Sequence, residues 1–182
     1  MQPIKVLLLF FLTNSMMSQN YVLDSENSKV NFVIKNLGLA VNGSFSGLKG
    51  NITFDPKNLK SFEITASVNS NSVNTDNKAR DKHLRKADYF DVEKYPEITF
   101  KSTKIEVAKR INRYDVEGTI TIKGISKPIK LEMLLTENGT KLELKCNFEI
   151  NRRNFKIGDS SMILSDTAKM SLLLIANQEA KK

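Results

Sequence analysis

Apolar and polar residues alternate with a period of two along most of the chain. In residues 114–122 every even position is apolar or glycine, and the odd positions carry Asp, Glu or Thr. Residues 62–68, 129–135 and 140–150 show the same alternation. A period of two places one face of a strand on an apolar interior and the other face in water. This pattern is typical of antiparallel sheets, because parallel sheets are buried on both faces and show continuous apolar runs.

The connections between these segments also favour an antiparallel sheet. Asn138 and Gly139 separate two alternating runs and predict a type I′ hairpin turn, and residues 124–128 form another tight link. The alternation slips by one residue at Gly47–Leu48, which predicts a bulge that bends one long strand. A similar slip separates Phe100 from Ile105.

The pattern predicts an all-β domain of about eight to ten strands with one short helix near residues 77–86. A sheet of this size must cover its apolar face with helices, with a second sheet or by closing on itself. No amphipathic helix in the sequence is long enough to cover the face, so a sandwich or a closed barrel remains. Glycine and proline are scarce and no low-complexity linker interrupts the chain, so residues 19–182 are expected to form a single domain.

The N-terminal residues have a different pattern. Lys5 precedes an unbroken apolar run from Val6 to Leu12, and small or polar residues follow through Ser18. This is typical of a cleavable secretory signal, and the run is too short to span a membrane, which takes about 20 apolar residues. We therefore expect residues 1–18 to be a signal peptide and the mature protein to be periplasmic or secreted.

The charge is basic but dispersed. The formal net charge of +8 falls by one when Lys5 is removed with the signal. Lys and Arg alternate with Asp and Glu along most predicted strands, and the chain has no Trp and no aromatic ladder for stacking bases. Nucleic-acid binding is therefore not expected. A solvated basic surface and transient contact with a membrane surface both stay open, as does a homodimer.

Catalytic chemistry has little support in the sequence. The one histidine, His83, and the one cysteine, Cys146, fall in different predicted elements, and Cys146 lies on the apolar register of its strand. One histidine without a cysteine partner makes a metal site improbable, and no glycine-rich phosphate loop is present. We predict that the protein is not an enzyme and has no catalytic residues, no bound metal and no cofactor.

Several short motifs share one order and spacing over roughly residues 21–176. They include R-D-x-H-L at 80–84, D-Y-F-D-V at 88–92 and Y-P-x-I-x-F-x-S at 95–102, together with residues 41–50 and 118–131. In this combination the sequence closely resembles the YceI-like family of lipocalin-like, polyisoprenoid-binding proteins. Two positions depart from the family pattern. Asn36 and the preceding Lys35 stand where the family often has histidine, and Lys156 stands where many members have glycine.

The resemblance selects the closed antiparallel barrel and implies a lumen that holds an isoprenoid-type or fatty-acyl lipid. The inward register supplies the predicted lumen residues, which are Phe32, Ile34, Phe45, Phe54, Phe62, Ile64, Phe100, Val116, Ile120, Leu131, Met133, Leu144, Phe148 and Phe155. Arg80, His83 and Arg85 are candidates for a rim that receives a lipid headgroup, since Arg geometry suits oxyanions; the alternative is a solvated helix face with local ion pairs.

Periodicity cannot distinguish a hollow barrel from one filled by side chains. Two alternatives to lipid carriage therefore remain. One is a filled barrel that acts through its surface as an interaction or stress-associated protein. The other is an enzyme acting on a bound lipid.

Overall fold

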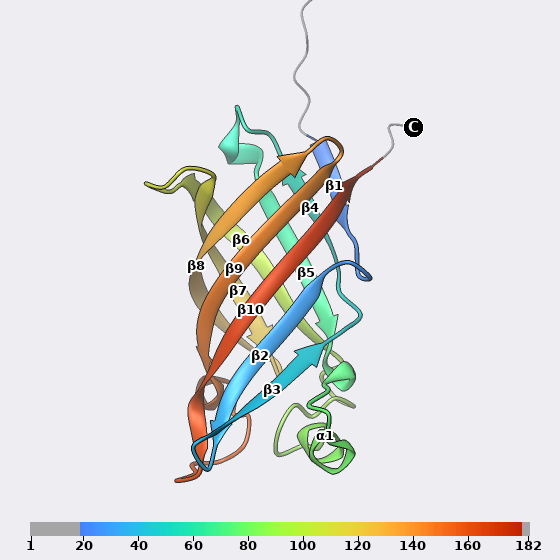
Figure 1. The fold of residues 1–182 in the computed structure, drawn as a ribbon, viewed down its shortest axis with the longest axis vertical. Coiled ribbons are helices and arrows are strands. Elements are labelled where there is room, and N and C mark those ends of the chain that lie inside the picture. Colours follow the sequence, from blue (N-terminus) through green and yellow to red (C-terminus); the bar gives the residue numbers. More distant parts are fainter. Residues whose placement is uncertain (1–18, 180–182) are drawn as a thin grey trace, which may run out of the picture.

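The computed structural model describes residues 19–179 as an antiparallel barrel (Figure 1). The strands are β1 (Gln19–Leu23), β2 (Lys29–Asn36), β3 (Leu39–Phe45), β4 (Lys49–Phe54), β5 (Glu63–Asn69), β6 (Glu97–Val107), β7 (Arg113–Ile122), β8 (Ile125–Asn138), β9 (Lys141–Asn151) and β10 (Leu164–Gln178). The helices are α1 (Lys78–Leu84) and the short 3-10 turns η1 (Leu59–Ser61), η2 (Ser70–Ser72) and η3 (Arg152–Phe155). The predicted signal peptide lies outside the described residues. Within residues 19–179 no helix is both long and apolar enough to cross a membrane.

The barrel closes through eight strands in the order β1-β4-β5-β6-β7-β8-β9-β10, with β10 pairing back to β1. Strands β2 and β1 lie end to end along β10, which pairs with β2 through Leu173 and with β1 from Ala176. Strand β3 pairs with β2, and in the described chain its other edge makes only a bridge from Ser44 to Asn74. The prediction of a closed all-β barrel with one short helix is confirmed.

The turns lie at the positions in the chain that the sequence pattern predicts, but their geometry differs. The hairpin between β8 and β9 forms, but its two central residues are Gly139 and Thr140, because Asn138 still pairs with Lys141. Only Gly139 has positive φ, as in a type II′ turn, so the type I′ prediction is wrong by one residue. The second phase slip is a register shift in β6 between Ser102 and Lys104.

The slip near Gly47 is a break rather than the predicted bulge. Strand β3 ends at Phe45 and β4 begins at Lys49, and the chain changes its pairing partners between them. Gly47 and Gly50 both have positive φ, and a Cβ on Gly50 would lie 2.0 Å from the carbonyl oxygen of Thr65. Glycine is therefore required where the chain turns from one strand into the next.

One end of the barrel is packed solid. Phe54 and Phe62 have ring centroids 4.9 Å apart, and Tyr114 meets both rings edge-on. Tyr21 and Leu142 are fully buried at this end, near which the described chain begins and finishes. We refer to this region as the packed end.

The other end is crossed by α1 and the loop after it, at the bottom of Figure 1. Asn77 caps α1 by accepting a hydrogen bond from the backbone N–H of Arg80 at 3.0 Å. Leu84 and Phe90 then pack against the barrel core, which anchors this crossing segment. The backbone N–H of Gly158 donates to the backbone carbonyl oxygen of Asp88 at 2.8 Å and ties the segment to the chain after η3.

Candidate ligand-binding site

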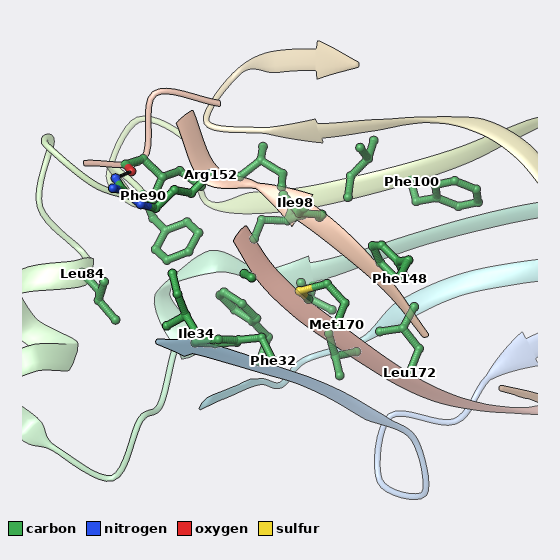
Figure 2. A pocket seen from close by; sticks show the side chains of 18 of the residues that line it. Phe32, Ile34, Leu84, Phe90, Ile98, Phe100, Phe148, Arg152, Met170 and Leu172 are labelled. Carbon is green, nitrogen blue, oxygen red and sulfur yellow. Dashed lines mark hydrogen bonds between the residues drawn. The ribbon is translucent and has the colours of Figure 1, made fainter. Parts of the chain in front are cut away.

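A cavity of about 350 Å³ lies inside the barrel at the end that α1 crosses. Figure 2 shows side chains from several strands and from the crossing segment directed into a common space, among them Phe32, Phe148, Met170 and Phe90. His83 is exposed and also lines the cavity, so the cavity reaches the surface beside α1. We refer to this region as the hollow end.

The lining is mostly apolar. Of the 34 lining residues, 26 are aliphatic, aromatic without a hydroxyl group, or methionine. The polar members are Asn36, Ser67, Thr75, Arg80, His83, Tyr89, Thr99 and Arg152. A site with one long apolar wall and a few polar groups suits an amphipathic molecule better than a sugar or a nucleotide.

Nine of the predicted lumen residues line this cavity. They are Phe32, Ile34, Phe45, Ile64, Phe100, Ile120, Leu131, Met133 and Phe148. Aromatic contacts fix some of these rings, since Phe45 packs at 5.6 Å from Phe32 and meets Phe90 edge-on at 5.4 Å. The side chains therefore form a preorganised wall rather than a loose lumen.

The other five predicted lumen residues do not line the cavity. Phe54, Phe62, Val116 and Leu144 belong to the main core cluster and fill space away from the cavity. Phe155 packs in a smaller cluster with Ile120, Ile150 and Ile157. All five are buried, although Phe155 lies in η3 and not on a strand, and burial alone does not show how far along the axis the barrel is filled.

The predicted rim residues separate into two groups. Arg80 and His83 line the cavity, whereas Arg85 lies on the outer surface and donates to the carbonyl oxygens of Asn71 and Val73 at 2.8 and 3.0 Å. The ring of His83 stacks edge-on against Tyr89, with centroids 4.8 Å apart. Arg85 thus holds the crossing segment to the chain after η2 instead of facing the cavity.

Arg80 is fixed by a small polar network. Its guanidinium Nε donates to Thr75 Oγ1 and its Nη2 donates to the carbonyl oxygen of Thr75, both at 2.7 Å. Thr75 Oγ1 in turn donates to Asp81 Oδ1 at 2.6 Å, and the backbone N–H of Thr75 donates to the same oxygen at 2.9 Å. This network orients the Arg80 guanidinium at the cavity, where its remaining N–H groups stay available.

Arg152 is the most extensively hydrogen-bonded side chain at the hollow end, and the sequence did not single it out. It is buried, lines the cavity and donates to the carbonyl oxygens of Ile157, Asp159, Leu164 and Ser165. Its fifth N–H donates to Asp166 Oδ1 at 2.8 Å. All five donors are therefore used, so Arg152 supports the loop before β10 and leaves no free donor for a ligand.

Asn36 has the opposite character. Its side-chain oxygen is buried at the cavity and accepts no hydrogen bond from residues 19–179. A buried acceptor without a partner costs about 1–3 kcal/mol, so such atoms usually have one. Asn36 therefore offers a vacant hydrogen-bond acceptor to a donor group inside the cavity.

The site has little of the chemistry that catalysis needs. Cys146 does not line the cavity, and burial, with a smaller contribution from Glu132, raises the pKa of its thiol to about 11. The thiol is therefore protonated near neutral pH and is a poor nucleophile. In the part of the chain that the structure describes, no group of three or more His, Cys, Asp or Glu side chains could hold a metal ion.

The cavity is energetically significant. Leaving about 350 Å³ empty costs up to about 8 kcal/mol relative to a filled core, at roughly 24 cal/mol per Å³. This is comparable with the whole stability of a typical domain, about 5–15 kcal/mol. Water gains little by entering, because the lining offers few hydrogen-bond partners.

A closed antiparallel barrel with such an apolar interior belongs to the class of lipocalin-like barrels.

Comparison with known proteins identifies the family. The model of the YceI-like domain matches residues 21–176, and Protein YceI of Salmonella arizonae is 38% identical over 134 residues, which are 72% of this chain and 69% of that protein. The chain therefore belongs to the YceI-like family.

Solved structures show the same fold. BcnA of Burkholderia cenocepacia is 26% identical with a TM-score of 0.80, covering 85% of this chain and 99% of its own. The YCEI protein of Campylobacter jejuni is 31% identical with a TM-score of 0.68, covering 78% and 86%. A polyisoprenoid binding domain from Saccharophagus degradans is 20% identical with a TM-score of 0.73, covering 87% and 98%, and this likeness shows the fold alone.

Proposed function

We propose that the protein is an exported carrier that holds one amphipathic lipid of isoprenoid or fatty-acyl type in the hollow end of the barrel. The observation that carries the proposal is the apolar cavity of about 350 Å³ with polar groups only at a few positions. Membership of the YceI-like family supports it, as does the description of one solved relative as a polyisoprenoid binding domain. Export rests on the signal-like pattern of residues 1–18.

The lipid tail would lie among Phe32, Phe100, Phe148 and Met170, which meet in the cavity (Figure 2). Each methylene group transferred from water contributes about 0.8 kcal/mol, so about 15 of them contribute roughly 12 kcal/mol. Several kcal/mol are then lost to association and to ordering of the chain. The remainder corresponds to micromolar or tighter binding, so apolar burial sets the affinity without any strong polar contact.

The headgroup would lie near Asn36, Arg80 and His83. Asn36 Oδ1 can accept a hydrogen bond and the free N–H groups of Arg80 can donate one. A hydroxyl group uses both, because it donates and accepts. A carboxylate or phosphate would use Arg80 and leave Asn36 unsatisfied. The polar groups therefore determine the orientation and the headgroup preference of the lipid, while the apolar wall determines the affinity.

Mass spectrometry of lipids extracted from the purified native protein tests the proposal. We expect one isoprenoid or acyl lipid per chain, and uptake of farnesol by delipidated protein. Phe148→Asp should reduce this uptake by at least about a hundredfold, because it places a carboxylate in the apolar wall. Asn147→Asp adds the same charge on the exposed face of β9 and is the matched control.

Folding of both variants is checked by circular dichroism and thermal unfolding before binding is compared. Repeated recovery of lipid-free protein that takes up neither isoprenoids nor fatty acids would contradict the proposal. Equal uptake by the two variants would place the lipid outside the cavity.

A further inference from the structure

Four exposed apolar side chains gather at the hollow end. Leu37 lies in the turn between β2 and β3, Leu39 is the first residue of β3, and Met162 and Ile163 lie in the segment before β10. We refer to these four residues as the apolar tip. The backbone N–H of Leu37 donates to the carbonyl oxygen of Ile163 at 2.8 Å, so the two segments are in direct contact, as Figure 1 also shows. Their exposed fractions range from 53% to 105%, so these side chains project into solvent.

Leu37 stands in a backbone conformation that leucine rarely adopts. Its φ is +51°, and Gly38 follows at +77°, as in a type I′ turn, where Asn or Gly is preferred at the first central position. Of the six non-glycine residues with positive φ in residues 19–179, the other five are Asp, Asn or Lys. The fold gains nothing from this leucine, because its side chain is exposed. A strained residue with an exposed apolar side chain indicates a role outside the folded chain.

The apolar tip is continuous with the cavity. Asn36 and Leu164, which pair across β2 and β10, both line the cavity and adjoin the tip in sequence. A molecule that leaves a membrane at the tip therefore meets residues of the cavity lining that are direct sequence neighbours of the tip residues.

The charge around the tip is positive. Residues 35–41, 122–128 and 151–166 contain six basic and two acidic side chains, of which Asp166 and the buried Arg152 form an ion pair. Along the barrel wall some exposed cations, such as Lys101 and Lys130, form ion pairs with glutamates, whereas Lys169 on β10 forms none within residues 19–179. Lys35, Lys127 and Lys156 are exposed near the tip and form no ion pair within residues 19–179. Unpaired cations around projecting aliphatic groups match an anionic lipid surface.

We propose that the apolar tip docks the barrel on an anionic bilayer surface, inserting Leu37, Leu39, Met162 and Ile163 among the lipid headgroups. A small cluster of aliphatic side chains that project from a turn suits a deformable lipid interface, whereas a protein partner would require a flat or grooved face. Docking at this end turns the cavity toward the membrane. Its use for loading and unloading lipid rests on the proposed carrier function, but the docking itself does not.

Flotation with vesicles of phosphatidylethanolamine containing a minority of phosphatidylglycerol tests the proposal. The tip variant carries Leu37→Asn and Met162→Asn. The matched control carries Val107→Asn and Ile111→Asn, which are similarly exposed aliphatic residues at the other end of the barrel, with exposed fractions of 65% and 89%. We expect the tip variant to bind the vesicles at least about tenfold more weakly than the wild type, and the control to bind like the wild type.

Two further measurements separate docking from folding and from cargo binding. Leu37→Asn should raise the midpoint of thermal unfolding while it weakens vesicle binding, because Asn-Gly fits the type I′ turn. Uptake of farnesol from solution should be the same in both variants, since neither alters a lining residue. Failure of farnesol uptake with normal flotation would reject the carrier function and leave the docking intact.

The docking proposal is overturned if the wild type does not float with these vesicles, or if both variants float equally. It is also overturned if light scattering shows a wild-type dimer that the tip variant dissociates, which would assign the tip to a second copy of the chain. Weaker binding to pure phosphatidylcholine vesicles and in high salt supports the part played by the unpaired lysines.

Discussion

At the packed end, Phe54, Phe62 and Tyr114 fill the space between the strands, whereas at the hollow end the same barrel encloses a cavity of about 350 Å³. The two ends also differ in their hydrogen bonds. Buried arginine, aspartate and serine side chains link separate segments by hydrogen bonds, and most of these links lie at the hollow end. Examples are the hydrogen bonds of Arg152, Asp81 and Ser70. The packed end is held mainly by apolar burial and by its strand pairing, and its side-chain ties, such as those of Arg110 and Arg113 to Glu132, lie nearer the surface.

This difference has a physical reason. An end filled with side chains gains about 25 cal/mol for each Å² of apolar surface that it buries, and needs no further support. An end that must stay open gives up part of this gain, so its walls need other contacts to keep their positions. Charge-assisted hydrogen bonds from Arg152 and Arg80 supply such contacts without occupying the cavity. We infer that polar contacts maintain the cavity and that the packed end supplies most of the folding free energy.

Replacing Arg152 should have the largest effect. Arg152→Met removes five hydrogen bonds and leaves the carbonyl oxygens of Ile157 and Leu164, among others, without their donor. We expect the free energy of unfolding to fall by about 3–5 kcal/mol, measured by urea denaturation. Lipid uptake should fall as well, because the loop that Arg152 holds forms part of the cavity wall.

Arg153→Met is the matched control for this prediction. Arg153 is exposed and adjacent in the chain, so its replacement should change stability by no more than about 0.5 kcal/mol. Equal effects of the two substitutions would show that polar contacts do not maintain the hollow end.

Strand β10 offers the same substitution at both ends. Ala168 lines the cavity, whereas Ala176 is fully buried at the packed end. Ala168→Met should fill empty space and stabilise the lipid-free protein by about 0.5–2 kcal/mol. Ala176→Met should overpack a filled region and destabilise the protein by about 1–3 kcal/mol.

Lipid binding should change only for the substitution at the hollow end. Ala168→Met should reduce farnesol uptake by about tenfold, because the longer side chain occupies the place of the ligand, whereas folded Ala176→Met protein should bind normally. Thermal unfolding and farnesol titration of both variants check this. Destabilisation by both substitutions would mean that the hollow end is as tightly filled as the packed end.

The sequence predicted the fold well because strand alternation is a local signal. Period-two alternation and the short connections determine an antiparallel sheet, and the absence of a covering helix favours closure. The phase slip at Gly47 predicts a bulge where the structure has a break between β3 and β4, because a phase slip marks a change of direction but not a change of pairing partner. The Asn138-Gly139 pair predicts a turn centred on both residues, because Asn-Gly usually occupies the centre of a hairpin turn, whereas here the strand pairing extends one residue further.

The site was less predictable from the sequence. Whether side chains fill the barrel at a given height along its axis depends on how residues from all the strands pack together. Alternation placed Phe62 and Phe148 on the same inward face but could not show that one is core and the other cavity wall. The lining residues Met170 and Leu172 were missed because a run of four aliphatic residues at 172–175 hides the alternation of β10. Arg152 carries no local signal, since its partners lie up to 14 residues away, in the loop after η3 and at the start of β10.

Asn36 gives the finest test of the difference between the packed and the hollow end, because its side-chain oxygen is a buried polar atom without a hydrogen-bond partner in residues 19–179. Asn36→Leu removes the buried acceptor and should stabilise the lipid-free protein by about 1 kcal/mol. In the wild type, farnesol should bind about five- to tenfold more tightly than its methyl ether, which has no hydroxyl proton to donate, and the substitution should abolish this preference. Isothermal titration with the two ligands measures both affinities. A preference that survives in Asn36→Leu would assign headgroup recognition to Arg80 or His83 alone, and the vacancy at Asn36 would then be a feature of the empty cavity rather than a contact of the bound lipid.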